Sequence, residues 1–66
     1  MHANHVLEIV VSSPHSFEDA IRAGILRASQ QVELAGGAKV AEQSIVEAPG
    51  GRAYHVVLQL PVSDSL

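Results

Sequence analysis

The sequence predicts an α+β fold with the element order β-α-β-β, in which a three-stranded antiparallel sheet of order 1-3-2 wraps around one helix. Three observations predict it: an aliphatic run near the start, a stretch with helical spacing, and a second extended run divided by a Pro-Gly-Gly turn. The helix returns the chain, so the first two strands point the same way. The hairpin reverses the third strand, which can then lie between the other two. We expect residues 1–66 to form a single domain.

The first strand is predicted over His5 to Val11, which is dense in β-branched and aliphatic residues. Strand alternation gives two faces, with Leu7, Ile9 and Val11 on one and Val6, Glu8 and Val10 on the other. A strand that is apolar on both faces is normally covered on both faces. One helix covers only one face of a sheet, so this strand predicts contact with other chains.

The helix is predicted to begin after Ser16, a good N-cap residue, with Glu18 and Asp19 at the positive end of the helix dipole. Helical spacing gives one apolar stripe rich in small residues: Phe17, Ala20, Ile21, Gly24, Ile25, Ala28 and Val32. Gly24 costs about 1 kcal/mol relative to alanine inside a helix, which is tolerable where the backbone must approach a sheet closely. We expect Gly36-Gly37 to end the helix.

The remainder is predicted to be a hairpin, with strands over Ala38 to Glu47 and Ala53 to Val62 joined by Pro49-Gly50-Gly51. The second strand alternates unevenly and is expected to place Val40, Glu42, Ser44 and Val46 on one face. The third strand is expected to have a core face of Tyr54, Val56, Leu58, Leu60 and Val62, and an opposite face of His55, Val57, Gln59 and Pro61. Because Pro61 has no N–H to donate, pairing should fail near it or that side of the strand must be free.

Composition independently indicates association with other chains. The chain has 66 residues and no cysteine, so disulfides and cysteine-based zinc sites are excluded. A domain of this size buries only about 60% of the surface of its unfolded chain.

The net charge of −3 and the lack of a basic patch argue against nucleic acid as a partner. No apolar run approaches the ~18 residues of a membrane span, and no signal peptide is recognisable, so we expect a cytoplasmic protein without a membrane partner.

Candidate ligand residues are scattered. The histidines are His2, His5, His15 and His55. None forms a pair with the spacing typical of a metal site, and surface or interface positions are the simplest interpretation. His55 is the exception, because it lies on the face assigned to assembly, where symmetry could bring copies together. Glu8 and Glu42 are charges on otherwise apolar strands. They predict either a solvated face with ion pairs between subunits, or a Mg²⁺ or Ca²⁺ site where subunits meet.

The sequence contains no arrangement that predicts catalysis. Serines and histidines are present, but there is no G-x-S-x-G nucleophile elbow and no cysteine. The glycine pairs Gly36-Gly37 and Gly50-Gly51 lie at turns and match no phosphate-binding loop. We therefore expect no enzymatic activity and assign no catalytic residue and no metal ligand.

Four segments resemble one known family when they are taken together. They are HVLEIVVSSP, the helix start SPHSFEDAI, the segment KVAEQ and GGRAYHVVLQLPV. Their order and spacing, from His5 to about Val62, are similar to those of the dodecin family. The most specific part is the stretch from Ser13 to Ala20, followed by the V-x-E strand at Val40 and Glu42. The resemblance implies a β-α-β-β protein that assembles into a hollow homododecamer.

The resemblance also implies a flavin site and a departure from it. Typical dodecins bind flavins in pairs across a twofold axis, with a tryptophan ahead of the V-x-E strand and a glutamine on the third strand. Carried over, the tryptophan falls at Gly37, within one position of alignment, and the glutamine falls at His55. This chain has no tryptophan.

The expected function is therefore that of a flavin-free dodecameric shell that binds or stores a small ligand or a cation, or is purely structural. One dodecin-like branch without the tryptophan is cation-binding, and the run from Val40 to Gln43 is similar to that branch. The alternative is a flavin-binding or flavin-storing dodecin with an altered pocket. There His55 would still hydrogen-bond FMN, FAD or riboflavin.

Overall fold

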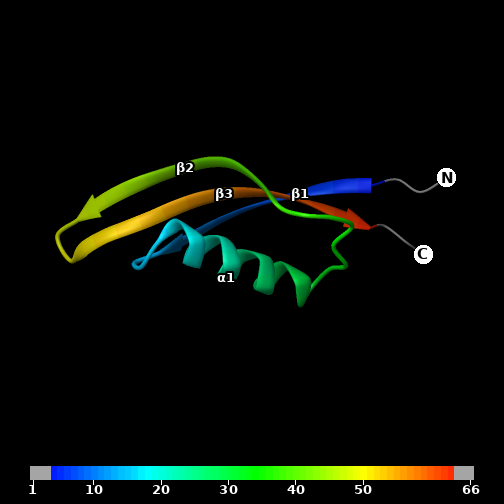
Figure 1. The fold of residues 1–66 in the computed structure, drawn as a ribbon, viewed down its shortest axis with the longest axis horizontal. Coiled ribbons are helices and arrows are strands. Elements are labelled where there is room, and N and C mark those ends of the chain that lie inside the picture. Colours follow the sequence, from blue (N-terminus) through cyan, green and yellow to red (C-terminus); the bar gives the residue numbers. More distant parts are fainter. Residues whose placement is uncertain (1–3, 64–66) are drawn as a thin grey trace.

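The computed structural model describes residues 4–63 and has the predicted order of elements (Figure 1). The elements are β1 (Asn4–Ser13), α1 (Phe17–Ser29), β2 (Lys39–Ala48) and β3 (Gly51–Ser63). The central strand, β3, pairs antiparallel with both β1 and β2, in the order β1-β3-β2. The predicted fold class and strand order are confirmed, and each strand end lies within two residues of its predicted position.

The core lies between α1 and the two strands it covers, β1 and β3. Its fully buried centre is the predicted core face of β3, where Val56, Leu58 and Leu60 have no exposed surface. The register places three aliphatic residues of β1 opposite them: Val11, Ile9 and Leu7. The predicted faces of β1 and β3 are therefore confirmed.

Helix α1 starts as the sequence predicts and packs closely against the sheet. The Ser16 hydroxyl accepts a hydrogen bond from the backbone N–H of Asp19 at 3.0 Å. The buried positions are one turn apart, at Ala20, Gly24 and Ala28. A Cβ atom added at Gly24 would lie 2.9 Å from Leu58 Cδ1 and 3.0 Å from Val11 Cγ1. The close approach expected at Gly24 is present.

The helix ends earlier than predicted. It stops at Ser29, where the backbone N–H groups of Gln30 and Gln31 turn back to carbonyls three residues earlier. Residues 33–35 then run extended beside the end of β3, where Ala35 N–H donates to the Pro61 carbonyl at 2.8 Å and Ser63 N–H donates to the Glu33 carbonyl at 2.9 Å. The expectation that Gly36-Gly37 ends the helix is wrong, because this pairing with β3 replaces further helical turns.

The predicted faces of β2 are also wrong at one end of the strand. The register with β3 shifts between Val40, which pairs with Leu58, and Glu42, which pairs with Val57. This β-bulge inserts one residue and exchanges the two faces. Val40 therefore lies on the helix side of the sheet together with Gln43 and Ile45, while Glu42, Ser44 and Val46 lie on the outer side.

The β2–β3 hairpin and Pro61 follow the sequence expectations. Ala48 pairs with Gly51, so Pro49 and Gly50 form a two-residue turn, and Gly51 has a φ of +139°, which favours glycine. Pairing between β2 and β3 ends at Gln59, before Pro61. The Pro61 carbonyl faces residues 33–35, so the side on which Pro61 lacks an N–H faces that segment and not β1.

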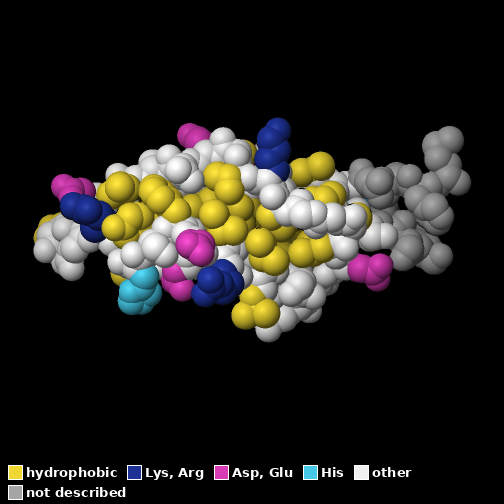
Figure 2. Space-filling model, viewed as in Figure 1, with side chains coloured by type: hydrophobic (Ala, Val, Ile, Leu, Met, Phe, Trp, Pro, Cys, Tyr) yellow, Lys and Arg dark blue, Asp and Glu magenta, His cyan; other side chains and the backbone are white. Residues whose placement is uncertain are grey.

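Two apolar surfaces remain uncovered. The outer sheet face exposes Val6, Val10 and Val46, at 66%, 60% and 45%. The second surface is the helix side of β2. This strand projects beyond α1, and all ten of its residues are exposed. Figure 2 shows hydrophobic side chains in a band along the molecule on the face where β2 lies above α1. In the part of the chain that the structure describes, no helix is long and apolar enough to cross a membrane.

Candidate functional site

His55 occupies the middle of the outer sheet face. It lies on β3, paired with Ser12 of β1 on one side and Ser44 of β2 on the other, so the imidazole stands between two serines. The residue is half-buried. Its Nδ1 atom is buried, and no hydrogen-bond partner within residues 4–63 reaches it. A buried polar atom without a partner is costly, which makes His55 the strongest candidate ligand residue.

Gly37 lies at the opposite end of the strands from this histidine. It is exposed, two residues ahead of β2, and a Cβ atom added there would meet nothing within 4 Å. The start of β2, Lys39, pairs with Gln59, which is four residues along β3 from His55. Four strand residues span about 13 Å. One copy of the chain therefore does not bring Gly37 and His55 together, and a site that uses both needs two copies.

The two strand carboxylates, Glu8 and Glu42, both lie on the outer face. Glu8 accepts a long hydrogen bond of 3.4 Å from Nε2 of Gln59, its partner across the strands. The ion pairs found among residues 4–63 use other acids: Arg22 with Glu18, and Arg52 with Glu47. The described residues contain no group of three or more histidine, cysteine or acidic side chains that could hold a metal ion. Within one copy, the carboxylates do not form the cation site considered above.

The other histidines lie elsewhere in the fold and do not form a cluster with His55. His5 is exposed on β1 and paired with Val62, and His15 is exposed in the turn before α1. His2 lies outside the described residues.

The turn between β1 and α1 brings a serine, an aspartate and a histidine close together, but not in a catalytic arrangement. Ser13, which is 3% exposed, donates its hydroxyl hydrogen to Asp19 Oδ2 at 2.6 Å. The backbone N–H of His15 donates to the same hydroxyl oxygen at 3.0 Å. A nucleophilic serine needs a base beside an accessible hydroxyl. Here the hydroxyl is buried and joins two elements, which is a structural role.

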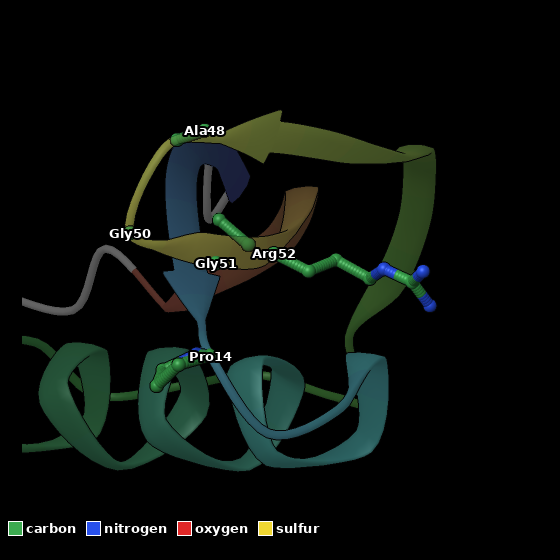
Figure 3. Close-up of a pocket in the computed structure, with 6 residues that line it drawn as sticks. Pro14, Ala48, Gly50, Gly51 and Arg52 are labelled. Atoms are coloured by element: carbon green, nitrogen blue, oxygen red, sulfur yellow. The ribbon is translucent and has the colours of Figure 1, made fainter.

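Two of the hollows among residues 4–63 adjoin the sheet. One, of about 360 Å³, lies at the hairpin end and is lined by small residues, with Arg52 at its edge. Figure 3 shows the Arg52 side chain extending away from Pro14 and the turn glycines. The other, of about 300 Å³, lies between β1 and α1 and is lined by Leu7, Ile9, Val10, Val11, Arg27, Ala28 and Gln31.

The sequence reasoning missed the exposed helix-side face of β2, where Val40 and Ile45 are 39% and 49% exposed. The signal was present as the uneven alternation of the strand, but the position of a bulge cannot be taken from alternation alone. It also missed the pairing of the only two aromatic residues. The rings of Phe17 and Tyr54 meet edge to face, with centroids 5.1 Å apart, on the helix side of the sheet.

The comparisons with known proteins agree with this geometry. Residues 4–61 match the sequence model of the Dodecin family. The structure is similar to dodecin from Streptomyces coelicolor, with a TM-score of 0.86 and 26% identity over 98% of this chain and 94% of that one. It is similar to dodecin from Streptomyces davaonensis, with a TM-score of 0.84 and 29% identity over 98% and 97%. It also resembles the calcium dodecin of Mycobacterium tuberculosis, with a TM-score of 0.77 and 29% identity over 97% and 90%. Comparison with the curated proteins finds no match.

A sheet that covers one side of a single helix, with its other face open, defines the class as small α+β proteins of β-α-β-β topology. Within that class, the chain belongs to the dodecin family. Dodecins are small oligomeric proteins that bind flavins and are not enzymes. The family resemblance deduced from the sequence is thereby confirmed.

The described residues do not fit a stacked flavin or a cation within one copy. The position that the family resemblance assigns to the stacking ring is Gly37, which has no side chain, and the rings of Phe17 and Tyr54 pair with each other. His55 retains one feature of a ligand site in its unpartnered Nδ1. For a cation, Glu8 and Glu42 supply oxygen atoms of the type that Ca²⁺ and Mg²⁺ prefer, but too few in one copy.

Proposed function

We propose that this dodecin, as a single domain over residues 1–66, forms a homododecameric cytoplasmic shell that does not hold flavin in the stacked manner of its family. The observation that carries the proposal is Gly37, an exposed glycine in open space where the resemblance places the stacking ring. The shell binds or stores a small ligand or a cation, or serves as a structural assembly.

The energetic argument concerns stacking. An aromatic pair contributes roughly 0.5–1.5 kcal/mol beyond the area it buries. A glycine supplies neither the ring nor the buried area, and the chain contains no tryptophan at another position that could replace it. In an assembly in which two copies contribute to each site, both copies lack the ring, so the loss of stacking energy per site is larger.

A flavin titration tests this directly. We expect no quenching of FMN fluorescence by the wild-type protein at low micromolar concentration. The Gly37→Trp variant should quench, since a side chain there meets nothing within 4 Å. The matched control is Gly50→Trp, because a Cβ at this turn also meets open space but lies at the other end of the strands. A yellow preparation, or quenching by the wild type, would overturn the flavin-free proposal.

The alternative, a flavin-binding dodecin with an altered pocket, is favoured by one observation. The buried Nδ1 of His55 lacks a partner within residues 4–63 and would gain one from a hydrogen-bonding ligand. If the wild type does bind FMN, riboflavin or FAD, His55→Ala should weaken that binding, while Ser12→Ala, one strand away, should change it less.

The cation hypothesis is supported by the position of Glu8 and Glu42 on the outer face and by the likeness to a calcium dodecin. Carboxylates from two copies would supply the oxygen ligands that one copy lacks. The melting temperature should then fall with a chelator and recover with Ca²⁺ or Mg²⁺, and the Glu42→Gln variant should lose this response. A melting temperature that a chelator leaves unchanged would count against a stored cation.

A further inference from the structure

Strand β1 has an open backbone edge. In β3, Pro61 and Ser63 turn their backbone groups toward residues 33–35, on the β2 side of the sheet. Backbone groups alternate sides along an antiparallel strand, so the residues of β3 between them turn toward β1. The register then leaves five residues of β1 with N–H and C=O groups directed away from β3: Asn4, Val6, Glu8, Val10 and Ser12. An edge of this length is a template for another strand.

The cavity beside α1 lies along this same edge. It has a volume of about 300 Å³, and its floor is aliphatic, with Leu7, Ile9 and Val11 from β1 and Ala28 from α1. Arg27 and Gln31 also line it. A strand added beside β1 would place the side chains of one face over this cavity. The incoming strand therefore needs apolar residues on its helix side.

Strand β2 has that character and a free edge of its own. Its ten residues equal β1 in length. The β-bulge turns Val40 to the helix side of the sheet, where it and Ile45 remain exposed because α1 covers only β1 and β3. Gln43 lies between them on that face and suits the polar groups of Arg27 and Gln31.

We propose that β2 of one copy adds to the β1 edge of the next copy, so that Val40 and Ile45 cover the cavity between β1 and α1. Both strands run antiparallel to β3, so a neighbour in the same orientation presents β2 parallel to β1, with the same face toward the helices. The contact is head-to-tail, and repetition of such a contact closes a ring or builds a filament. This inference rests on the proposed self-assembly and assigns its interface.

Polar contacts support the same pairing. Neither ion pair found in the described part of the chain uses Arg27, which lines the cavity. Glu42 lies on the outer face of β2 and Glu47 pairs with Arg52, so the group on the helix side of β2 that can accept a hydrogen bond from the Arg27 guanidinium is the amide of Gln43.

The test compares two adjacent residues of β2 that are similarly exposed but lie on opposite faces. Ile45 is 49% exposed on the helix side and Val46 is 45% exposed on the outer side. Sedimentation velocity should show loss of the large species for Ile45→Lys and retention of it for Val46→Lys, with the far-ultraviolet circular dichroism of both unchanged. An Ile45→Lys protein that assembles like the wild type, or an equal loss with Val46→Lys, would overturn the inference.

A second pair of variants tests the other side of the contact and decides the matter if Ile45→Lys does not fold. Arg27→Glu changes the cavity without touching β2 and should also lose the large species. The control is Arg22→Glu, on the same helix but outside the cavity, where the side chain is exposed. Assembly of Arg27→Glu equal to that of Arg22→Glu would contradict the proposal. A wild-type protein that is monomeric would instead refute the self-assembly itself.

Discussion

Gly24 lies where the helix approaches the sheet closely. Its backbone packs against Leu58 and Val11, so an added methyl group would have no room. Two effects of Gly24→Ala oppose each other: alanine gains about 1 kcal/mol in helix propensity, and overpacking a core costs about 1–3 kcal/mol. The methyl group would lie 2.9 Å from a buried leucine that is fully enclosed, so the overpacking outweighs the propensity.

We expect Gly24→Ala to lower the melting temperature. A loss of about 1 kcal/mol corresponds to a fall of roughly 4–8 °C in a domain of this size. The matched control is Gly37→Ala, where the same methyl group enters open space and should change stability by no more than about 0.5 kcal/mol. Both are measured by thermal unfolding at one protein concentration, since self-association makes the melting temperature depend on concentration. A Gly24→Ala protein as stable as the wild type would contradict this packing.

The positions of the two proposed ligand residues, His55 and Gly37, could be predicted only in part from the sequence. The family resemblance proposes His55 and Gly37 as pocket positions, which stays a prediction, and strand alternation correctly placed His55 on the outer face. It could not show that the two lie at different ends of the strands, because that separation depends on the register between β2 and β3. Nor could it show that His55 Nδ1 is buried without a partner in the described chain.

At the scale of elements, β1 and α1 are joined by one buried hydroxyl. Ser13, at the end of β1, donates to Asp19 in the first turn of α1 and accepts from the backbone of His15. Ser13→Ala removes both hydrogen bonds, and since one hydrogen bond contributes about 0.5–1.5 kcal/mol net, the two together contribute about 1–3 kcal/mol. Urea unfolding should show a loss of this size.

The neighbouring residue supplies the control for that measurement. Ser12 is exposed on the other face of the same strand, so Ser12→Ala should change the free energy of unfolding by less than about 0.5 kcal/mol. Equal effects of the two substitutions would mean that the Ser13–Asp19 hydrogen bond does not stabilise the turn.

Elements that depend on local signals were predicted correctly, and elements that depend on pairing between distant segments were not. Strand alternation and the N-cap at Ser16 are local signals, and they placed β1, β3 and the helix start correctly. The helix end and the faces of β2 depend on distant partners. Residues 33–35 leave the helical path because β3 offers them backbone hydrogen bonds, and the bulge beside Val40 is defined only by pairing with β3.

At the scale of the whole molecule, the fold is incomplete as a single copy. The molecule measures 49 × 19 × 15 Å, and one helix of thirteen residues covers two of its three strands on one face. The outer face, the helix side of β2 and both sheet edges remain open. Exposed apolar surfaces of this kind mark sites of association. The first strand, which is apolar on both faces, predicts contact with other chains, and these open surfaces are where such contact can form.

Sedimentation velocity of the wild-type protein at micromolar concentration tests the central claim, self-assembly into a shell, most directly. Each chain has a mass of 7.0 kDa. We predict one dominant species with a mass near that of twelve chains, stable on dilution through the micromolar range. A protein that sediments as a monomer under these conditions would contradict the account.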